Sequence, residues 1–304
     1  MSIDDITLNF SPGSLTLLNA ILAIVMFSIA IDLKPRDFRA LARGPRPLIT
    51  GLISQFLVLP VLTFALVWIT EPRASIALGL ILVAACPGGN ISNFITHRAG
   101  GNAALSVSMT AFATVGAIFL TPLNIALWGS LYPPTRAILQ ETEIDPVQIA
   151  ITVSLMLILP LVLGIQLNLR HPELTARLRK PLQYLSFGIF IAFIVLALAA
   201  NWNFFLGYAG MVAGLVVIHN ALALSGGYAT ATLAGLSPFN RRAVTIETGI
   251  QNSGLGLVLI FAFFNGLGGM AVVAAFWGIW HAISGIGLAA IMARSPAARE
   301  EALG

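Results

Sequence analysis

Nine apolar runs, each at least about 20 residues long, are the feature that most limits how this chain can fold. They lie at 13–33, 47–70, 75–98, 103–130, 147–168, 182–201, 207–235, 243–264 and 269–293. A helix of about 20 residues crosses the ~30 Å hydrocarbon core of a bilayer. Hydrophobic residues make up 58% of the chain and charged residues only 9%, whereas soluble domains carry about 25% charged residues. We therefore predict an all-α polytopic membrane protein with nine transmembrane helices.

The basic residues predict how these helices are oriented. Of the 16 Lys and Arg residues, all but Arg73 and Arg136 fall on one side of the predicted spans. Because cytoplasmic loops carry the excess of Lys and Arg, we expect a plasma (inner) membrane protein with its N-terminus outside and its C-terminus in the cytoplasm. The net positive charge then reflects topology, and no nucleic-acid partner is expected. The opening MSIDDITLNF has no basic residue, so the first run is expected to be a retained span, not a cleaved signal peptide.

One acidic residue is predicted to lie at membrane depth. Of the 12 Asp and Glu residues, only Glu247, in VTIETGIQNSGLGLVLI, falls away from the loops and span edges. An ionised carboxylate there costs several kcal/mol unless it is paired, protonated or bound to a cation. No Lys or Arg lies in the interior of a predicted span to pair with it, since Arg98 is the last residue of the third run. Glu247 is therefore either a protonated core residue, or a ligand for a coupling ion or a carrier of protons.

Two of the runs contain helix-breaking residues near their centres. Pro87, Gly88 and Gly89 interrupt the third run, and Gly249 and Gly254 flank polar residues in the eighth. Paired interruptions of this kind mark the binding site in transporters built from inverted repeats. Spans 1–4 can pair with spans 6–9 in opposite orientation, which leaves span 5 unmatched. This pattern predicts an inverted repeat that lacks the first helix of its first half.

Polar side chains gather around both interruptions and offer oxygen atoms. Backbone broken at membrane depth is tolerated only where it lines a cavity or binds something. Oxygen ligands without a Cys or His cluster favour a hard cation over a transition metal, and the chain has a single cysteine. The one formal charge of Glu247 suits a monovalent ion. We predict that the bound ion is Na⁺, with H⁺ as the second candidate.

Two long motifs, CPGGNISNFITHRAGGNAALSVSMT (86–110) and ETGIQNSGLGLVL (247–259), closely resemble the two crossover motifs of the bile acid:sodium symporter family. LKPRDF, VIHN and IWHAISG also resemble family segments, so the resemblance extends from roughly Leu15 to Ala293. It implies two crossing broken helices. It also implies a panel domain (13–33, 147–168 and 182–201) and a core domain (47–130 and 207–293) that rock against each other for alternating access.

The resemblance also implies two sodium sites and a substrate cavity. The first sodium site maps onto Ser92, Asn93, Ser106, Thr110 and Glu247. The second maps onto Gln55, Glu247 and Gln251, with backbone carbonyls near Thr248 and Ile250. The substrate candidates are Asn90, Asn252, Ser253 and His281. Two departures from the family pattern, Asn at position 90 and Ala282 after His281, leave the ion sites intact and the substrate undecided.

We therefore predict a sodium-coupled secondary active symporter that imports an organic anion, either bile-acid-like or a small carboxylate, with no obligatory protein partner. A proton-coupled carrier of the same fold is the alternative. An intramembrane enzyme is not favoured, because the chain has no His-Glu-x-x-His or Gly-x-Ser-x-Gly motif. A single buried carboxylate also lacks the partner that a catalytic dyad needs. For His219, beside Asn220 in span 7, both a structural hydrogen bond and a cavity role stay open.

Overall fold

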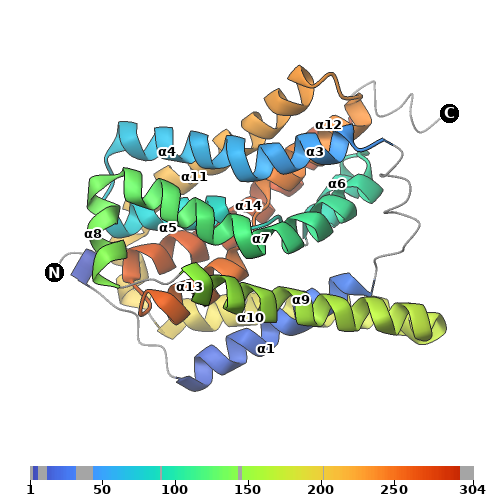
Figure 1. Cartoon of the computed structure of the whole chain (residues 1–304), viewed down its shortest axis with the longest axis horizontal. Coiled ribbons are helices and arrows are strands. Elements are labelled where there is room, and N and C mark those ends of the chain that lie inside the picture. The colour runs from blue at the N-terminus through green and yellow to red at the C-terminus, as the bar shows by residue number, and fades with distance from the viewer. Residues whose placement is uncertain are drawn as a thin grey trace.

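The computed structural model describes residues 3–5, 12–31, 44–89, 91–142, 146–200 and 202–294, and every regular element in these ranges is helical (Figure 1). The all-α prediction is therefore confirmed for the described residues. The elements are η1 (Ile3–Asp5), α1 (Pro12–Ala30), α3 (Arg46–Ile53), η2 (Ser54–Val58), α4 (Leu59–Thr70), α5 (Ala74–Ala85), α6 (Ile91–Arg98), α7 (Ala103–Leu131), α8 (Pro133–Glu141), α9 (Pro146–Arg170), α10 (Pro172–Ala200), α11 (Trp202–Leu233), α12 (Pro238–Gly249), α13 (Ser253–Phe263) and α14 (Gly268–Met292).

Several helices are long and apolar enough to cross a membrane. Within the described ranges there are five such stretches: Arg46–Thr70, Ala103–Leu131, Val147–Arg170, Val212–Leu233 and Gly268–Met292. Large apolar side chains also point outward from them, as at Ile151, Leu155 and Leu159, spaced four residues apart on α9. One exposed apolar stripe on a helix of this length suits contact with lipid. The chain is a multi-pass membrane protein, and the count of nine spans stays a prediction.

Three helices lie together along one side of the molecule. Figure 1 shows α1, α9 and α10 side by side, below the remaining helices, and α1 packs against both of the others. Gly164 on α9 allows this packing, because a Cβ at that position would overlap the side chain of Ala30 on α1. A second contact joins this group to α7, where Ala111 packs with Ala30 and Leu161. The group also joins the main core through larger side chains, among them Ile21 on α1 and Leu157 on α9.

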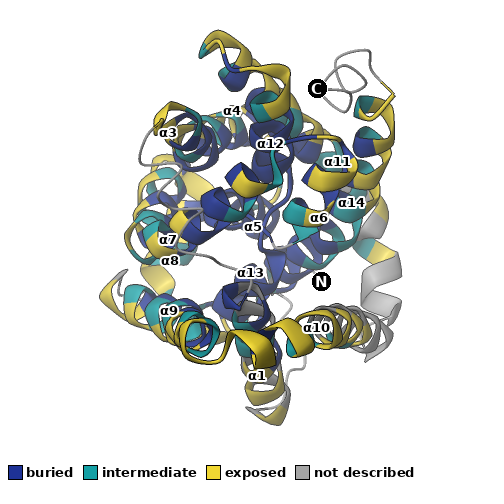
Figure 2. Cartoon of the chain, turned by 90° about the vertical axis from the view of Figure 1, so that its right-hand side faces the viewer, coloured by how far each residue is buried: buried dark blue, intermediate teal, exposed yellow. Residues whose placement is uncertain are grey.

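The centre of the larger group is formed by short helices that are apolar on all sides. Figure 2 shows α5 and α13 near the centre, coloured as buried. Every residue of α5 from Ser75 to Ala85 is buried, as is every residue of α13 from Ser253 to Ile260. A helix that is hydrophobic all round is stable only when other helices surround it. Accordingly, α5 packs against α4, α7, α8 and α14.

The stretch Arg46–Thr70 contains a wide turn at its midpoint. Residues Ser54–Val58 form the π-helical turn η2, in which the Leu59 N–H donates to the Ser54 carbonyl. Pro60 follows, and it has no N–H for the carbonyl of Phe56 and carries a ring that crowds that carbonyl in an α-helix. A π-turn relieves this crowding, and such turns often occur at functional sites. Gln55 lies within this turn and is buried.

Candidate functional site

The two helix breaks predicted from the sequence are both present, and they lie against each other. The first separates α5 from α6, where Cys86 becomes extended (φ −72°, ψ 155°) before Pro87. The second separates α12 from α13, where Ile250 is extended (φ −119°, ψ 102°). Gly88 and Gln251 pair as an antiparallel bridge. The Gly89 N–H donates to the Ile250 carbonyl at 2.7 Å, and the Asn252 N–H donates to the Pro87 carbonyl at 2.9 Å.

Glycine is required on one side of this contact because the two backbones approach so closely. A Cβ on Gly89 would lie 2.7 Å from the carbonyl oxygen of Gln251. A Cβ on Gly88 would overlap the carboxylate oxygen Oε1 of Glu247. Because these two glycines have no side chains, the first break can contact both the main chain of the second break and the Glu247 carboxylate.

The Glu247 carboxylate is fully buried and accepts three hydrogen bonds from hydroxyl groups. Oε2 accepts from Ser92 at 2.6 Å and from Ser106 at 2.8 Å, and Oε1 accepts from Thr110 at 2.6 Å. The amide oxygen Oδ1 of Asn93 lies beside the same hydroxyls, at 2.8 Å from Ser106 and 3.4 Å from Thr110. The side chains of the predicted first sodium site therefore meet at one point, from α6, α7 and α12.

This cluster contains more acceptors than donors. The Ser106 hydroxyl has one hydrogen but lies within hydrogen-bond distance of both Asn93 Oδ1 and Glu247 Oε2. The Thr110 hydroxyl likewise reaches Glu247 Oε1, Asn93 Oδ1 and the Ser106 carbonyl. A hydroxyl donates only one hydrogen bond, and a carboxylate and an amide oxygen donate none. The surplus oxygen lone pairs suit a hard cation, or an added proton on Glu247.

Gln55 and Gln251 form a second polar group beside the break. Gln55 Nε2 donates to the Cys86 carbonyl at 3.0 Å and to Gln251 Oε1 at 2.6 Å. Gln251 Nε2 in turn donates to the Thr248 carbonyl at 2.7 Å. Gln55 Oε1 is buried and has no hydrogen-bond partner among the described residues. Because a buried acceptor without a partner is costly, this oxygen is a candidate ligand. The predicted Ile250 carbonyl already accepts from Gly89.

The predicted substrate residues differ in what the structure shows of them. Asn252 is buried; its Oδ1 accepts from the Leu255 N–H and caps α13, while its Nδ2 has no partner among the described residues. His281 is buried against the Trp277 ring, and its Nδ1 also has no described partner. Ser253 is buried as the first residue of α13. Asn90 lies outside the described residues.

His219 has a structural role. The Trp277 indole N–H donates to His219 Nδ1 at 2.8 Å, and His219 Nε2 lies 2.6 Å from the Thr63 hydroxyl. Since an indole N–H can only donate, Nδ1 must accept and the ring proton must be on Nε2. Thr63 completes the chain by donating to the Leu59 carbonyl. Both ring nitrogens are thus used, which decides between the two roles that the sequence left open.

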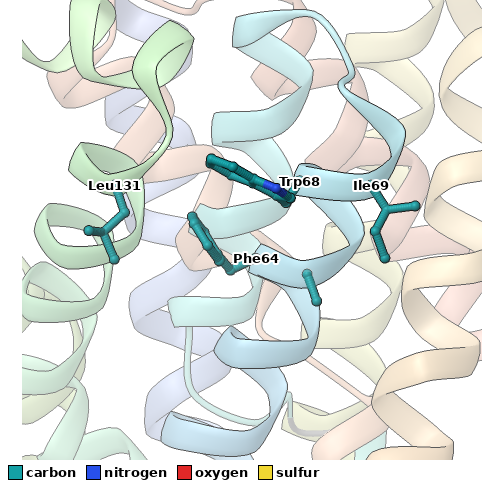
Figure 3. A pocket seen from close by; sticks show the side chains of 5 residues that line it. Phe64, Trp68, Ile69 and Leu131 are labelled. Atoms are coloured by element: carbon teal, nitrogen blue, oxygen red, sulfur yellow. The ribbon is translucent and has the colours of Figure 1, made fainter.

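A shallow depression on the surface differs from these polar groups, because its lining is apolar. It is lined by Phe64, Ala65, Trp68, Ile69 and Leu131 on α4 and α7 (Figure 3). Phe64 packs on Trp68 and on Trp128, with ring centroids 5.8 Å and 5.2 Å apart. Aromatic side chains of this kind gather at membrane interfaces. No His, Cys, Asp or Glu lines the depression, so the candidate site is the polar cluster at the two breaks.

One known protein family matches more than half of this chain. Residues 19–207 match the model of the "Sodium Bile acid symporter family". This chain belongs to that family. The family's members are sodium-dependent transporters and not enzymes, which confirms the resemblance recognised in the two crossover motifs.

Three relatives illustrate the similarity. The "Uncharacterized sodium-dependent transporter YocS" of Bacillus subtilis is 32% identical over 268 residues, covering 88% of this chain and 80% of that protein. The rice "Probable sodium/metabolite cotransporter BASS2, chloroplastic" is 31% identical, covering 80% of this chain and 56% of its own length. The mouse "Sodium-dependent organic anion transporter" is 28% identical, covering 82% of this chain and 65% of its own length. The chain thus spans between about half and two thirds of the length of the rice and mouse proteins.

Proposed function

We propose that this protein is a symporter that couples the inward movement of Na⁺ to the uptake of an organic anion. The observation that supports this most strongly is the buried Glu247 carboxylate, surrounded by hydroxyl and amide oxygens from α6 and α7. Membership of a sodium-dependent transporter family gives this oxygen cluster its expected ligand. The site would lie in the plasma membrane, with the N-terminus outside and the C-terminus in the cytoplasm.

Glu247 would serve two sodium ions. The first ion would take oxygen ligands from the hydroxyl cluster, relieving the shortage of donors around the carboxylate. The second would use the free Gln55 Oε1, Gln251 and backbone oxygens at Thr248 and Ile250. Because a cation offsets the cost of a buried negative charge, Na⁺ would keep Glu247 ionised and hold α6, α7 and α12 together around it.

The substrate would bind next to the joined breaks, between two parts of the protein that move against each other. We assign α1, α9 and α10 to the panel and the remaining long helices to the core. The Asn252 Nδ2 donor, together with the N-terminus of α13, would favour a negatively charged group on the substrate. A carboxylate meets this requirement, whether it belongs to a bile-acid-like molecule or to a small organic acid. Ser253, His281 and Asn90 are the further candidates.

The first test is the thermal stability of the purified protein in NaCl and in KCl at equal ionic strength. An ion that binds only the folded state stabilises it, by about 2.7 kcal/mol at a hundred times its Kd. We expect a higher Tm in NaCl for the wild type, no sodium effect for Glu247→Ala, and a weakened effect for Gln251→Ala. A wild-type Tm that is the same in both salts would contradict sodium binding.

The same donor shortage also favours the alternative, a proton-coupled carrier, because a proton on Glu247 would supply a missing donor. Uptake into liposomes distinguishes the two. A screen of bile acids and 2-keto acids would be run with an imposed sodium gradient and, separately, with an imposed pH gradient. Uptake driven by sodium alone supports the main proposal, and uptake driven by the pH gradient alone supports the alternative.

A further inference from the structure

The carbonyl ends of the half-helices α5 and α12 are buried at the break. The last carbonyls of a helix have no N–H partner within the helix and must find one elsewhere. At the end of α5, the Cys86 carbonyl accepts from Gln55 Nε2 at 3.0 Å. At the end of α12, the Gly249 carbonyl accepts from Asn220 Nδ2 at 2.8 Å. An amide side chain from another helix therefore holds each end.

These two amides occupy equivalent places in the sequence. Gln55 lies in the long helical stretch just before the first broken segment, and Asn220 lies in α11, just before the second. The contacts join residues 31 and 29 positions apart. Spans 2 and 7 correspond in the proposed inverted repeat, so Asn220 is the counterpart of Gln55. The same kind of hydrogen bond, from a side-chain amide to the carbonyl end of a half-helix, thus occurs at both breaks.

The two counterparts differ in what remains free. Gln55 keeps a buried oxygen without a described partner, which suits an ion ligand. Asn220 is 1% exposed and has both polar atoms engaged, since its Oδ1 accepts from the Ser284 hydroxyl on α14 at 2.5 Å. Asn220 is therefore fully used as a link between α14 and the end of α12. Its direct contact with the end of α12 is the hydrogen bond to the Gly249 carbonyl.

The hydrogen bond from Asn220 holds Gly249 at the point where α12 ends. Gly249 lies between Thr248 and Ile250, whose carbonyls are the proposed backbone ligands. Glycine has the widest choice of backbone angles, so its peptide groups are the least fixed by local geometry. The α11 helix restrains it twice: Asn220 holds its carbonyl, and Leu224, one turn further along, fills the space that a Cβ would need.

We propose that Asn220 is a positioning residue for the sodium sites, which fixes the direction of the carbonyls at the end of α12. This inference rests on the proposed sodium coupling. Mutation of a group that orients a metal ligand without touching the metal typically weakens metal affinity by about 10-fold or more. Asn220 would act in the same way: it lies on α11, is held by Ser284 of α14, and holds the Gly249 carbonyl of α12.

The test is a sodium titration of thermal stability at constant ionic strength, with K⁺ replacing Na⁺, on the full-length purified protein. Asn220→Leu keeps the side chain's size but removes both hydrogen bonds. We expect the Na⁺ concentration for half of the stabilisation to rise about 10-fold. The matched control is Asn124→Leu. Asn124 is also buried, donates to the Leu120 carbonyl at 2.8 Å and accepts from Trp128 at 2.9 Å, but all of this lies within α7.

The control should lower the Tm in KCl and leave the sodium half-concentration unchanged. If Asn220→Leu behaves like this control, Asn220 is only structural and the inference is wrong. Ser284→Ala is a milder variant for the case in which Asn220→Leu does not fold; a shift of a few-fold in the same direction supports the inference, and no shift overturns it. A wild type without any sodium response would instead refute the proposed function itself.

Discussion

The hydroxyl of Thr110 stands apart from the others around Glu247. Ser92 and Ser106 both donate to Oε2, whereas Thr110 is the hydroxyl donor found at Oε1 among the described residues. One turn further along α7, Thr114 donates to the carbonyl of Thr110 in the ordinary way of a Thr within a membrane helix. These two threonines, one turn apart on the same helix, thus differ in that only the Thr110 hydroxyl reaches Glu247 and Asn93.

This difference gives a prediction for a single hydroxyl. Thr110→Val keeps the shape of the side chain and removes a direct oxygen ligand, so we expect the half-concentration for sodium stabilisation to rise roughly 10-fold or more. Thr114→Val should change stability by only about 1 kcal/mol and leave the sodium response as in the wild type. Equal sodium responses for the two variants, measured by the same titration, would refute the role of Thr110 as a ligand.

At the scale of the helices, the sequence was most informative where a residue type restricts the backbone. Pro87 with two glycines, and Gly249 with Gly254, predicted both breaks, because proline removes a helix hydrogen bond and glycine is a poor helix former. The short helix α8 was not predicted, although Pro133 and Pro134 at its start are a typical helix-opening signal. The π-turn at Ser54–Val58 was also missed, since Pro60 alone does not show how a helix accommodates it.

Partners far apart in the sequence were harder to predict. The residues around Glu247 were named through resemblance to a family, and the structure brings the described ones together. The roles of His219 and Asn220 depended on which groups from α4, α12 and α14 face them. No local pattern contains that information, because side-chain hydrogen bonds between helices follow from packing.

The contact between the breaks predicts the effect of one added methyl group. Gly89→Ala would place a Cβ 2.7 Å from the Gln251 carbonyl oxygen, so we expect a loss of roughly 1–3 kcal/mol of stability and a loss of the sodium response. Gly287→Ala on α14, where a Cβ meets no atom within 4 Å, should be neutral or stabilising by up to about 1 kcal/mol. Thermal unfolding of both variants in NaCl and KCl measures this; a stable, sodium-responsive Gly89→Ala would contradict it.

For the whole molecule, the proposed mechanism requires α1, α9 and α10 to move relative to α7. One small cluster allows a direct comparison, because it brings together Leu161 on α9, Ala111 on α7 and Ala30 on α1. The native cysteine, Cys86, is buried, which limits its reaction with added reagents. Cysteine pairs introduced in this cluster can therefore join either the proposed panel to the core or two helices within the panel.

We expect a short cross-linker between Ala111→Cys and Leu161→Cys to stop sodium-driven uptake in liposomes while sodium stabilisation persists. The same cross-linker between Ala30→Cys and Leu161→Cys should leave uptake intact, since both helices belong to the proposed panel. Uptake that continues in the first cross-linked protein would show that the boundary between the moving parts lies elsewhere.

The joint between the two breaks is made by main-chain atoms, through Gly89 to Ile250 and Asn252 to Pro87. Main-chain groups are common to every sequence, so apart from its glycines this joint places few demands on the neighbouring side chains. Mutations that reshape the proposed substrate site can then accumulate without separating the half-helices. In evolutionary terms, a lineage of such carriers can change its cargo one residue at a time and inherit its ion-binding machinery unaltered.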